Sequence, residues 1–79
     1  MTTFQVATAK TEHAVRLLCH RSELGAITGP ELRAGLDGEI TDEQMTAALG
    51  DLQRRHRVTY KHALGTGIGA LHDIRSTRS

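Results

Sequence analysis

The residues with the clearest chemical potential are a group of bases between positions 54 and 61. Arg54, Arg55, Arg57 and Lys61 occur there without an acid, and His56 lies among them. Arginine can hold a phosphate or a guanine edge with two parallel hydrogen bonds. The group therefore predicts a phosphate-binding surface. Two other readings stay open, because bases at a helix C-terminus also complement the helix dipole, and an acidic protein partner would suit the same charges.

Metal binding and catalysis have less support in the sequence. None of the five histidines has the His-x3-His or Cys-x2-Cys spacing of a zinc site, so we expect surface histidines and no metal or other cofactor. Cys19 is the only cysteine, which excludes an internal disulfide. We expect a buried thiol there, with a reactive or dimer-linking thiol as the alternative. A catalytic thiol would need a histidine base nearby, and the adjacent His20 would point away from Cys19 on a helix. We therefore expect a protein that is not an enzyme.

A glycine-rich stretch offers a third possible chemistry, that of a phosphate loop. Gly65, Gly67 and Gly69 alternate along the chain. They do not follow a strand into a helix, which is the context that a dinucleotide-binding loop requires. A flexible turn explains these glycines better.

The length and composition limit the protein to a small single domain. The chain has 79 residues, a formal net charge of +1 and only two aromatic residues, Phe4 and Tyr60. So few aromatics exclude a base-stacking surface for single strands. No apolar run is long enough to cross a membrane, and the N-terminus lacks the pattern of a signal peptide, so we expect a cytoplasmic protein.

The charges are unevenly distributed. Acids prevail from Glu31 to Glu43, bases follow, and Arg75 and Arg78 add charge to the tail. The acidic stretch is typical of helix starts, where the dipole favours anions. It would also suit a negative patch that imitates nucleic-acid phosphate or meets a basic protein surface.

The first half of the chain predicts two helices. Residues 1–7 are expected to form an N-terminal arm, with Phe4 and Val6 alternating as in an edge strand. A helix is expected from about Ala9 to about Ser22, with Thr8 as its cap and Gly25 as its terminator. After a short extended link over residues 26–28, Pro30 predicts the start of a second helix that ends near Leu36.

The third helix has the strongest start signal. Thr41 and Gln44 have the spacing of a capping box, and Ile40 and Met45 that of a hydrophobic staple. Asp42 and Glu43 fill the first turn, where acids are favoured. The expected buried stripe consists of Met45, Ala48, Leu49 and Leu52.

Beyond Arg57 the apolar period changes to two, which predicts a β-hairpin. Val58, Tyr60 and His62 alternate first, residues 65–67 form a turn, and Ile68, Ala70, His72 and Ile74 alternate again. Residues 75–79 are expected to be a disordered basic tail.

This order of elements resembles the winged helix-turn-helix family. The segments that carry the resemblance are AITGPELRAGL, ITDEQMTAALGDLQRRHRVTYKH and ALGTGIGALHDI, within residues 8–74. The resemblance implies an α+β, mainly α fold, with three helices and a C-terminal two-stranded β-hairpin wing. It also implies that the third helix enters the major groove of duplex DNA while the wing touches the backbone. The residues that would contact DNA or another partner are Thr46, Ala47, Gly50, Gln53, Arg54, Arg57, Lys61 and Thr66.

Two functions fit this reading. The first is a small transcriptional regulator that binds duplex DNA, expected as a homodimer because one winged helix reads few base pairs. The second is a phage- or mobile-element-type interaction protein that inhibits a host protein or nucleoprotein complex, as an anti-CRISPR-like inhibitor would. Asp42 and Glu43 repel phosphate, and Ala47 and Gly50 have no hydrogen-bonding side chain, so only modest DNA affinity is expected.

Overall fold

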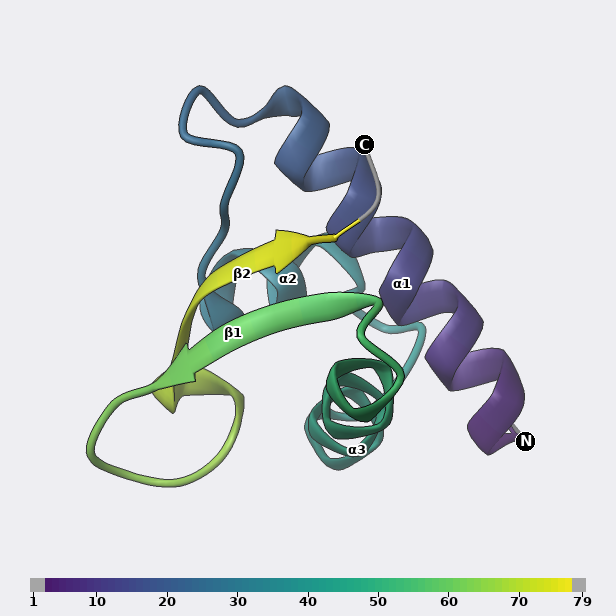
Figure 1. Cartoon of the computed structure of the whole chain (residues 1–79). Coiled ribbons are helices and arrows are strands. Elements are labelled where there is room, and N and C mark those ends of the chain that lie inside the picture. The colour runs from purple at the N-terminus through teal and green to yellow at the C-terminus, as the bar shows by residue number, and fades with distance from the viewer. Residues whose placement is uncertain (1–2, 78–79) are drawn as a thin grey trace.

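The structure, a computed structural model, describes residues 3–77 as three helices followed by a two-stranded antiparallel sheet (Figure 1). A short 3-10 turn, η1, precedes the last strand. The elements are α1 (Phe4–Arg21), α2 (Gly29–Gly35), α3 (Asp42–Arg54), β1 (Val58–His62), η1 (Ile68–Ala70) and β2 (Leu71–Ser76). The expected α+β, mainly α layout, with three helices and a C-terminal hairpin, is confirmed.

The first helix begins earlier than the sequence analysis expected. Thr3 is its cap, and its hydroxyl accepts a hydrogen bond from the Val6 amide at 3.2 Å. Thr8 lies inside the helix, where its hydroxyl donates to the Phe4 carbonyl at 2.8 Å. Residues 4–7 thus form the first turn of α1 and not an arm, because they contain no glycine or proline that would stop a helix. Met1 and Thr2 lie outside the described residues.

The first helix ends at Arg21, and not through Gly25 as expected. Ser22 leaves the helix in an extended conformation (φ −81°, ψ 137°), and its amide donates to the carbonyls of Leu18 and Cys19. Gly25 does adopt a positive φ of 67°, but in the loop that follows. The extended Ser22 conformation is therefore what terminates the helix.

The two shorter helices start with matching caps. At α3, the Gln44 amide donates to the Thr41 hydroxyl at 3.1 Å, and the Thr41 amide donates to the Gln44 side chain at 2.9 Å. This confirms the predicted capping box. The same arrangement of Thr28 and Glu31 starts α2 one residue before Pro30. Both helix starts are thus fixed by residues three apart in the sequence.

The hairpin forms as predicted in β1, but the return strand has a different register. Thr59 pairs with Arg75 and Lys61 pairs with His72, so β2 carries an extra residue at this point. Asp73 accommodates this bulge with a positive φ of 52°. The expected strict alternation over residues 68–74 is therefore wrong, since residues 68–70 form η1 and the strand's core side chains, Leu71 and Ile74, are three apart.

The predicted tail is partly ordered. Arg75 and Ser76 belong to β2. Thr77 continues the pairing: its amide donates to the Arg57 carbonyl at 3.0 Å, and its hydroxyl donates to the His56 carbonyl at 2.6 Å. The expectation of disorder is therefore wrong for residues 75–77, and Arg78 and Ser79 lie outside the described residues.

One core joins all the elements. The second strand has β1 on one side and the single residue Ile27 on the other, where Ile27 and Ile74 exchange backbone hydrogen bonds of 2.9 and 2.8 Å. The predicted α3 stripe is buried in this core. The largest fully buried side chains are Leu32, Met45, Leu49, Leu52, Ile68, Ile74, Val15, Val58 and Thr11.

Candidate nucleic-acid interface

The face of α3 opposite the core carries the residues expected to read bases. Ala47 and Gln53 are exposed, whereas Thr46 and Gly50 are half-buried. The Thr46 hydroxyl donates to the Asp42 carbonyl at 2.9 Å, so it is engaged within the helix. Gln53 therefore provides the longest polar side chain among these four positions. Its amide can form two hydrogen bonds with adenine, donating one and accepting the other.

The wing tip lies beside the N-terminal half of this face. Gly67 lines a groove of about 370 Å³ together with Asp42, Glu43, Thr46 and Ala47. Figure 1 shows the loop between β1 and β2 and the helix α3 projecting at the same side of the molecule. The helix and the wing thus share one side, and of the two carboxylates in the lining Asp42 forms an ion pair with Arg33, at 3.4 Å between Oδ2 and Nη1.

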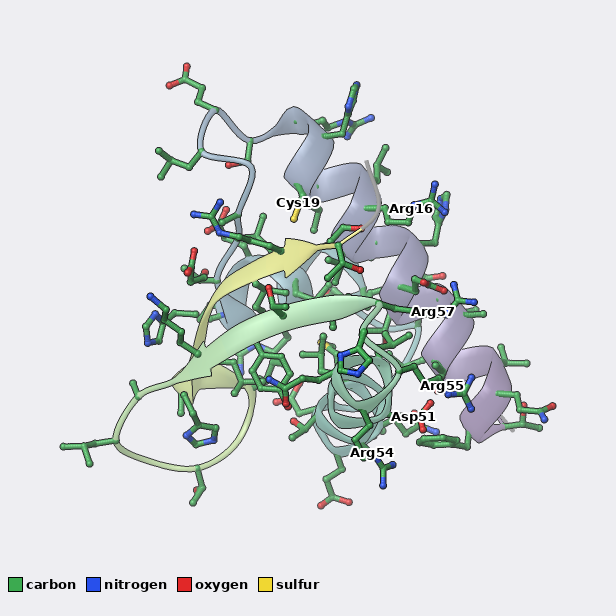
Figure 2. The ribbon with its side chains drawn as sticks, viewed as in Figure 1. Arg16, Cys19, Asp51, Arg54, Arg55 and Arg57 are labelled. Atoms are coloured by element: carbon green, nitrogen blue, oxygen red, sulfur yellow. The ribbon has the colours of Figure 1, made fainter. Side chains whose placement is uncertain are left out.

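The bases at the end of α3 are held by one acid. Asp51 lies between Arg54, whose Nη2 is 3.4 Å from Oδ1, and Arg55, whose Nε is 3.0 Å from Oδ2. The Asp51 side chain is only 13% exposed, while that of Arg54 is 78% exposed. In Figure 2 Asp51 and Arg55 lie on the side of α3 that faces α1, while Arg54 lies farther from α1.

Arg57 is directed toward α1 and not toward the wing. Its Nη1 donates to Glu12 Oε2 at 3.0 Å, which joins α1 to the segment between α3 and β1. Sequence reasoning did not find this pair, because its members are 45 positions apart and belong to different elements. Of the predicted phosphate contacts, Arg57 is thus the one whose ion pair links α1 to the segment between α3 and β1.

The wing has its own ion-pair group around the bulge. Asp73 Oδ2 lies 3.6 Å from Lys61 Nζ, and Arg75 Nε donates to Asp73 Oδ1 at 2.9 Å. The hydrogen bond from Arg75 lowers the pKa of the Asp73 carboxyl below its usual value. Lys61 therefore projects from the wing beside a carboxylate, whereas Thr66 is exposed at the wing tip.

Most of the positive charge of the described chain is balanced locally. Seven of the nine lysines and arginines in residues 3–77 lie in ion pairs with carboxylates: Lys10, Arg33, Arg54, Arg55, Arg57, Lys61 and Arg75. The other two, Arg16 and Arg21, lie on α1. Exposed ion pairs of this kind contribute only about 0–1 kcal/mol, so a phosphate can replace the carboxylate. The expected basic cluster is therefore present, but its four bases share three carboxylates, those of Asp51, Glu12 and Asp73, so its positive charge is only partly balanced.

The structure also bears on the cysteine, on metal binding and on membrane-spanning helices. The Cys19 thiol is buried and donates to the Ile74 carbonyl, with Sγ 3.3 Å from the oxygen, and burial raises its pKa. Within residues 3–77 no three histidine, cysteine or acidic side chains are gathered as a metal site would require. Over the same residues, no helix has the length and apolar character needed to cross a bilayer.

Comparison of the chain with known protein families, with curated proteins and with solved structures gives no significant match.

Proposed function

We propose that this chain is a small, non-enzymatic, cytoplasmic DNA-binding protein of the winged-helix type that regulates transcription. In this proposal α3 enters the major groove of duplex DNA and the wing contacts the neighbouring backbone. The observation that carries the proposal is the uncovered face of α3 next to the wing tip, with Ala47, Gln53 and Arg54 exposed on it. An α-helix fits the width of the major groove, and small side chains on its outer face allow close approach.

The phosphate contacts in this proposal come from Arg54 and Lys61. Their side chains are 78% and 71% exposed, so each can turn from its carboxylate partner to a phosphate. Two such contacts give a slope of log K against log salt of about −2. The proposed affinity is therefore modest and its salt dependence shallow.

The test is fluorescence anisotropy with a labelled duplex of random sequence at several salt concentrations. Binding should be seen at low salt, and Arg54→Ala or Lys61→Ala should each weaken it and reduce the slope by about 0.9. Arg21→Ala is the matched control, because Arg21 is an exposed arginine at the end of α1 and outside the proposed interface. Absence of binding at low salt would refute the proposal.

A second candidate function is favoured by the charge balance of the same surface. The paired arginines and the exposed carboxylate of Glu43 suit a protein that docks on a basic macromolecular partner, as expected for a phage-type inhibitor of a host complex. Glu43→Lys separates the two candidates, because Glu43 is exposed on the groove. The substitution should strengthen binding to duplex DNA, but weaken capture of a basic protein partner from a host extract.

We also propose that the protein acts as a homodimer assembled through α1. Phe4 and Val6, in the first turn of this helix, are exposed by 49% and 44%. A dimer would cover this apolar surface and double the number of base pairs read. Light scattering at high protein concentration should give twice the monomer mass, and Phe4→Glu together with Val6→Glu should return it to the monomer value.

A further inference from the structure

A hollow of about 660 Å³ opens between the C-terminal half of α1 and the end of β2. Figure 2 shows Arg16 and Cys19 in this part of the molecule, away from the end of α3 that carries Arg54. Its volume falls in the range of about 300–1,000 Å³ that is usual for small-molecule sites. The side chains that line it include His13, Arg16, Leu17, Cys19, His20 and Ser76.

The charge of this hollow differs from that of the α3 and wing surface. Among residues 3–77 no carboxylate forms an ion pair with Arg16, whereas the bases near α3 and the wing each have an acid as partner. No aspartate or glutamate is among the described residues that line the hollow. An arginine without an ion pair in the part of the chain that the structure describes is available for an anion from solution, and its planar guanidinium can hold two oxygens at once.

The spacing along α1 places further donors next to this arginine. His13, Arg16, Leu17 and His20 are separated by three, one and three positions, so they share one face of the helix. Imidazole nitrogens can donate to oxyanions, and Leu17 adds apolar surface at the same place. The four side chains therefore combine a fixed charge, additional donors and an apolar wall.

Charges of both signs act near the hollow, since, besides burial, Arg75 lowers and Glu31 raises the pKa of the Cys19 thiol, and the effect of Arg75 is the larger of the two. The Cys19 thiol is buried with a raised pKa, so it stays neutral and adds no negative charge. The carbonyls at the end of α1 carry partial negative charge, but the Ser22 amide already binds those of Leu18 and Cys19.

We propose that this hollow is a binding site for a small organic molecule bearing an oxyanion, a phosphate or a carboxylate, with Arg16 as its charged anchor. The guanidinium holds the oxyanion, His13 and His20 donate to it, and the organic part lies against Leu17. The site is distinct from the proposed DNA-binding surface, so it can exist whether or not the chain binds DNA.

The test is a titration of isotope-labelled protein followed by amide chemical shifts, with inorganic phosphate, acetate and phenyl phosphate as separate probes. Shifts should be confined to residues around His13, Arg16 and His20. Phenyl phosphate should bind roughly 5-fold more tightly than inorganic phosphate, because its ring can cover part of Leu17. Acetate shows whether a carboxylate binds as well as a phosphate does.

Two variants decide the outcome. Arg16→Gln should weaken binding of the preferred probe about 10-fold. Arg21→Gln removes the other arginine that has no ion pair within residues 3–77 and lies outside the described lining of the hollow, so it should have little effect. Equal weakening by both variants, shifts spread over Arg54 and Lys61, or no shifts at all would overturn the proposal. It would also be overturned if Arg16→Gln abolished binding of duplex DNA, because the arginine would then belong to a nucleic-acid surface.

Discussion

The ion pairs of Asp51 give the sharpest test of how the charges on α3 control DNA binding. The substitution Asp51→Asn removes the carboxylate that holds both Arg54 and Arg55 and leaves a side chain of nearly the same shape. Both guanidinium groups are then free to turn to phosphates. We therefore expect Asp51→Asn to bind duplex DNA more tightly than the natural protein.

The expected gain has two parts. Removing a negative charge about 7 Å from a phosphate relieves a repulsion of about 0.6 kcal/mol in water, which is roughly a 3-fold gain in affinity. Each freed arginine that contacts a phosphate steepens the slope of log K against log salt by about 0.9. At low salt the combined gain should be about 3- to 10-fold, and it should shrink as salt is added.

The control must change the net charge without freeing an arginine. Glu23→Gln does so, since Glu23 is exposed in the loop after α1, at the opposite end of the molecule from α3 (Figure 1). Anisotropy titrations at several salt concentrations measure both variants. Equal affinity and slope in Asp51→Asn and Glu23→Gln would refute the reasoning, because the effect would then be one of net charge alone.

Fold stability should respond little to this substitution. Pairs three or four positions apart on a helix contribute about 0.3–0.5 kcal/mol each, so Asp51→Asn should cost less than about 1 kcal/mol. A melting temperature within a few degrees of the natural protein's would confirm that binding is compared between equally folded molecules.

Three further predictions concern the fold that positions the surface. His56 has a φ of 60° just after α3, so His56→Gly should stabilise the protein by about 1 kcal/mol and raise its melting temperature by about 4–8 °C. A Cβ at Gly29 would overlap a carbonyl oxygen of η1, so Gly29→Ala should unfold at clearly lower denaturant concentration, and an unchanged midpoint would contradict the described packing. The pKa of Asp73 is lowered by its hydrogen bond from Arg75, so its stabilising effect is present above about pH 4 and is lost as the pH falls through the lowered value. Asp73→Asn should therefore be less stable than the natural protein at pH 7, and the difference should narrow in chemical denaturation at pH 3.

Local signals in the sequence predicted the elements well where neighbouring residues decide them. The α3 capping box and buried stripe, and the start of β1, follow from residues a few positions apart, and the structure confirms them. The start of α1 was missed because Thr8 has the same capping chemistry as Thr3. Only the absence of a helix breaker between them could have favoured the earlier start.

The features that the sequence did not reveal depend on distant residues. The bulge at Asp73 arises from pairing with β1, and alternation within the return strand alone could not predict it. The pairing of Arg57 with Glu12 likewise depends on how α1 packs near the end of α3. The run of bases from Arg54 to Lys61 predicted a basic surface, but the pairing of Arg57 with Glu12 and of Lys61 with Asp73 depends on residues distant in sequence.

The bulge at Asp73 also affects the tendency of the sheet to aggregate with the sheets of other molecules. With Ile27 and β1 on either side of β2, the outer edge of β1 is left with unpaired backbone groups in the described sheet. Such an edge can recruit a strand from another molecule and begin aggregation. A bulge increases local twist, and the charged Lys61 stands beside it, so a flat intermolecular sheet would be hard to extend from here.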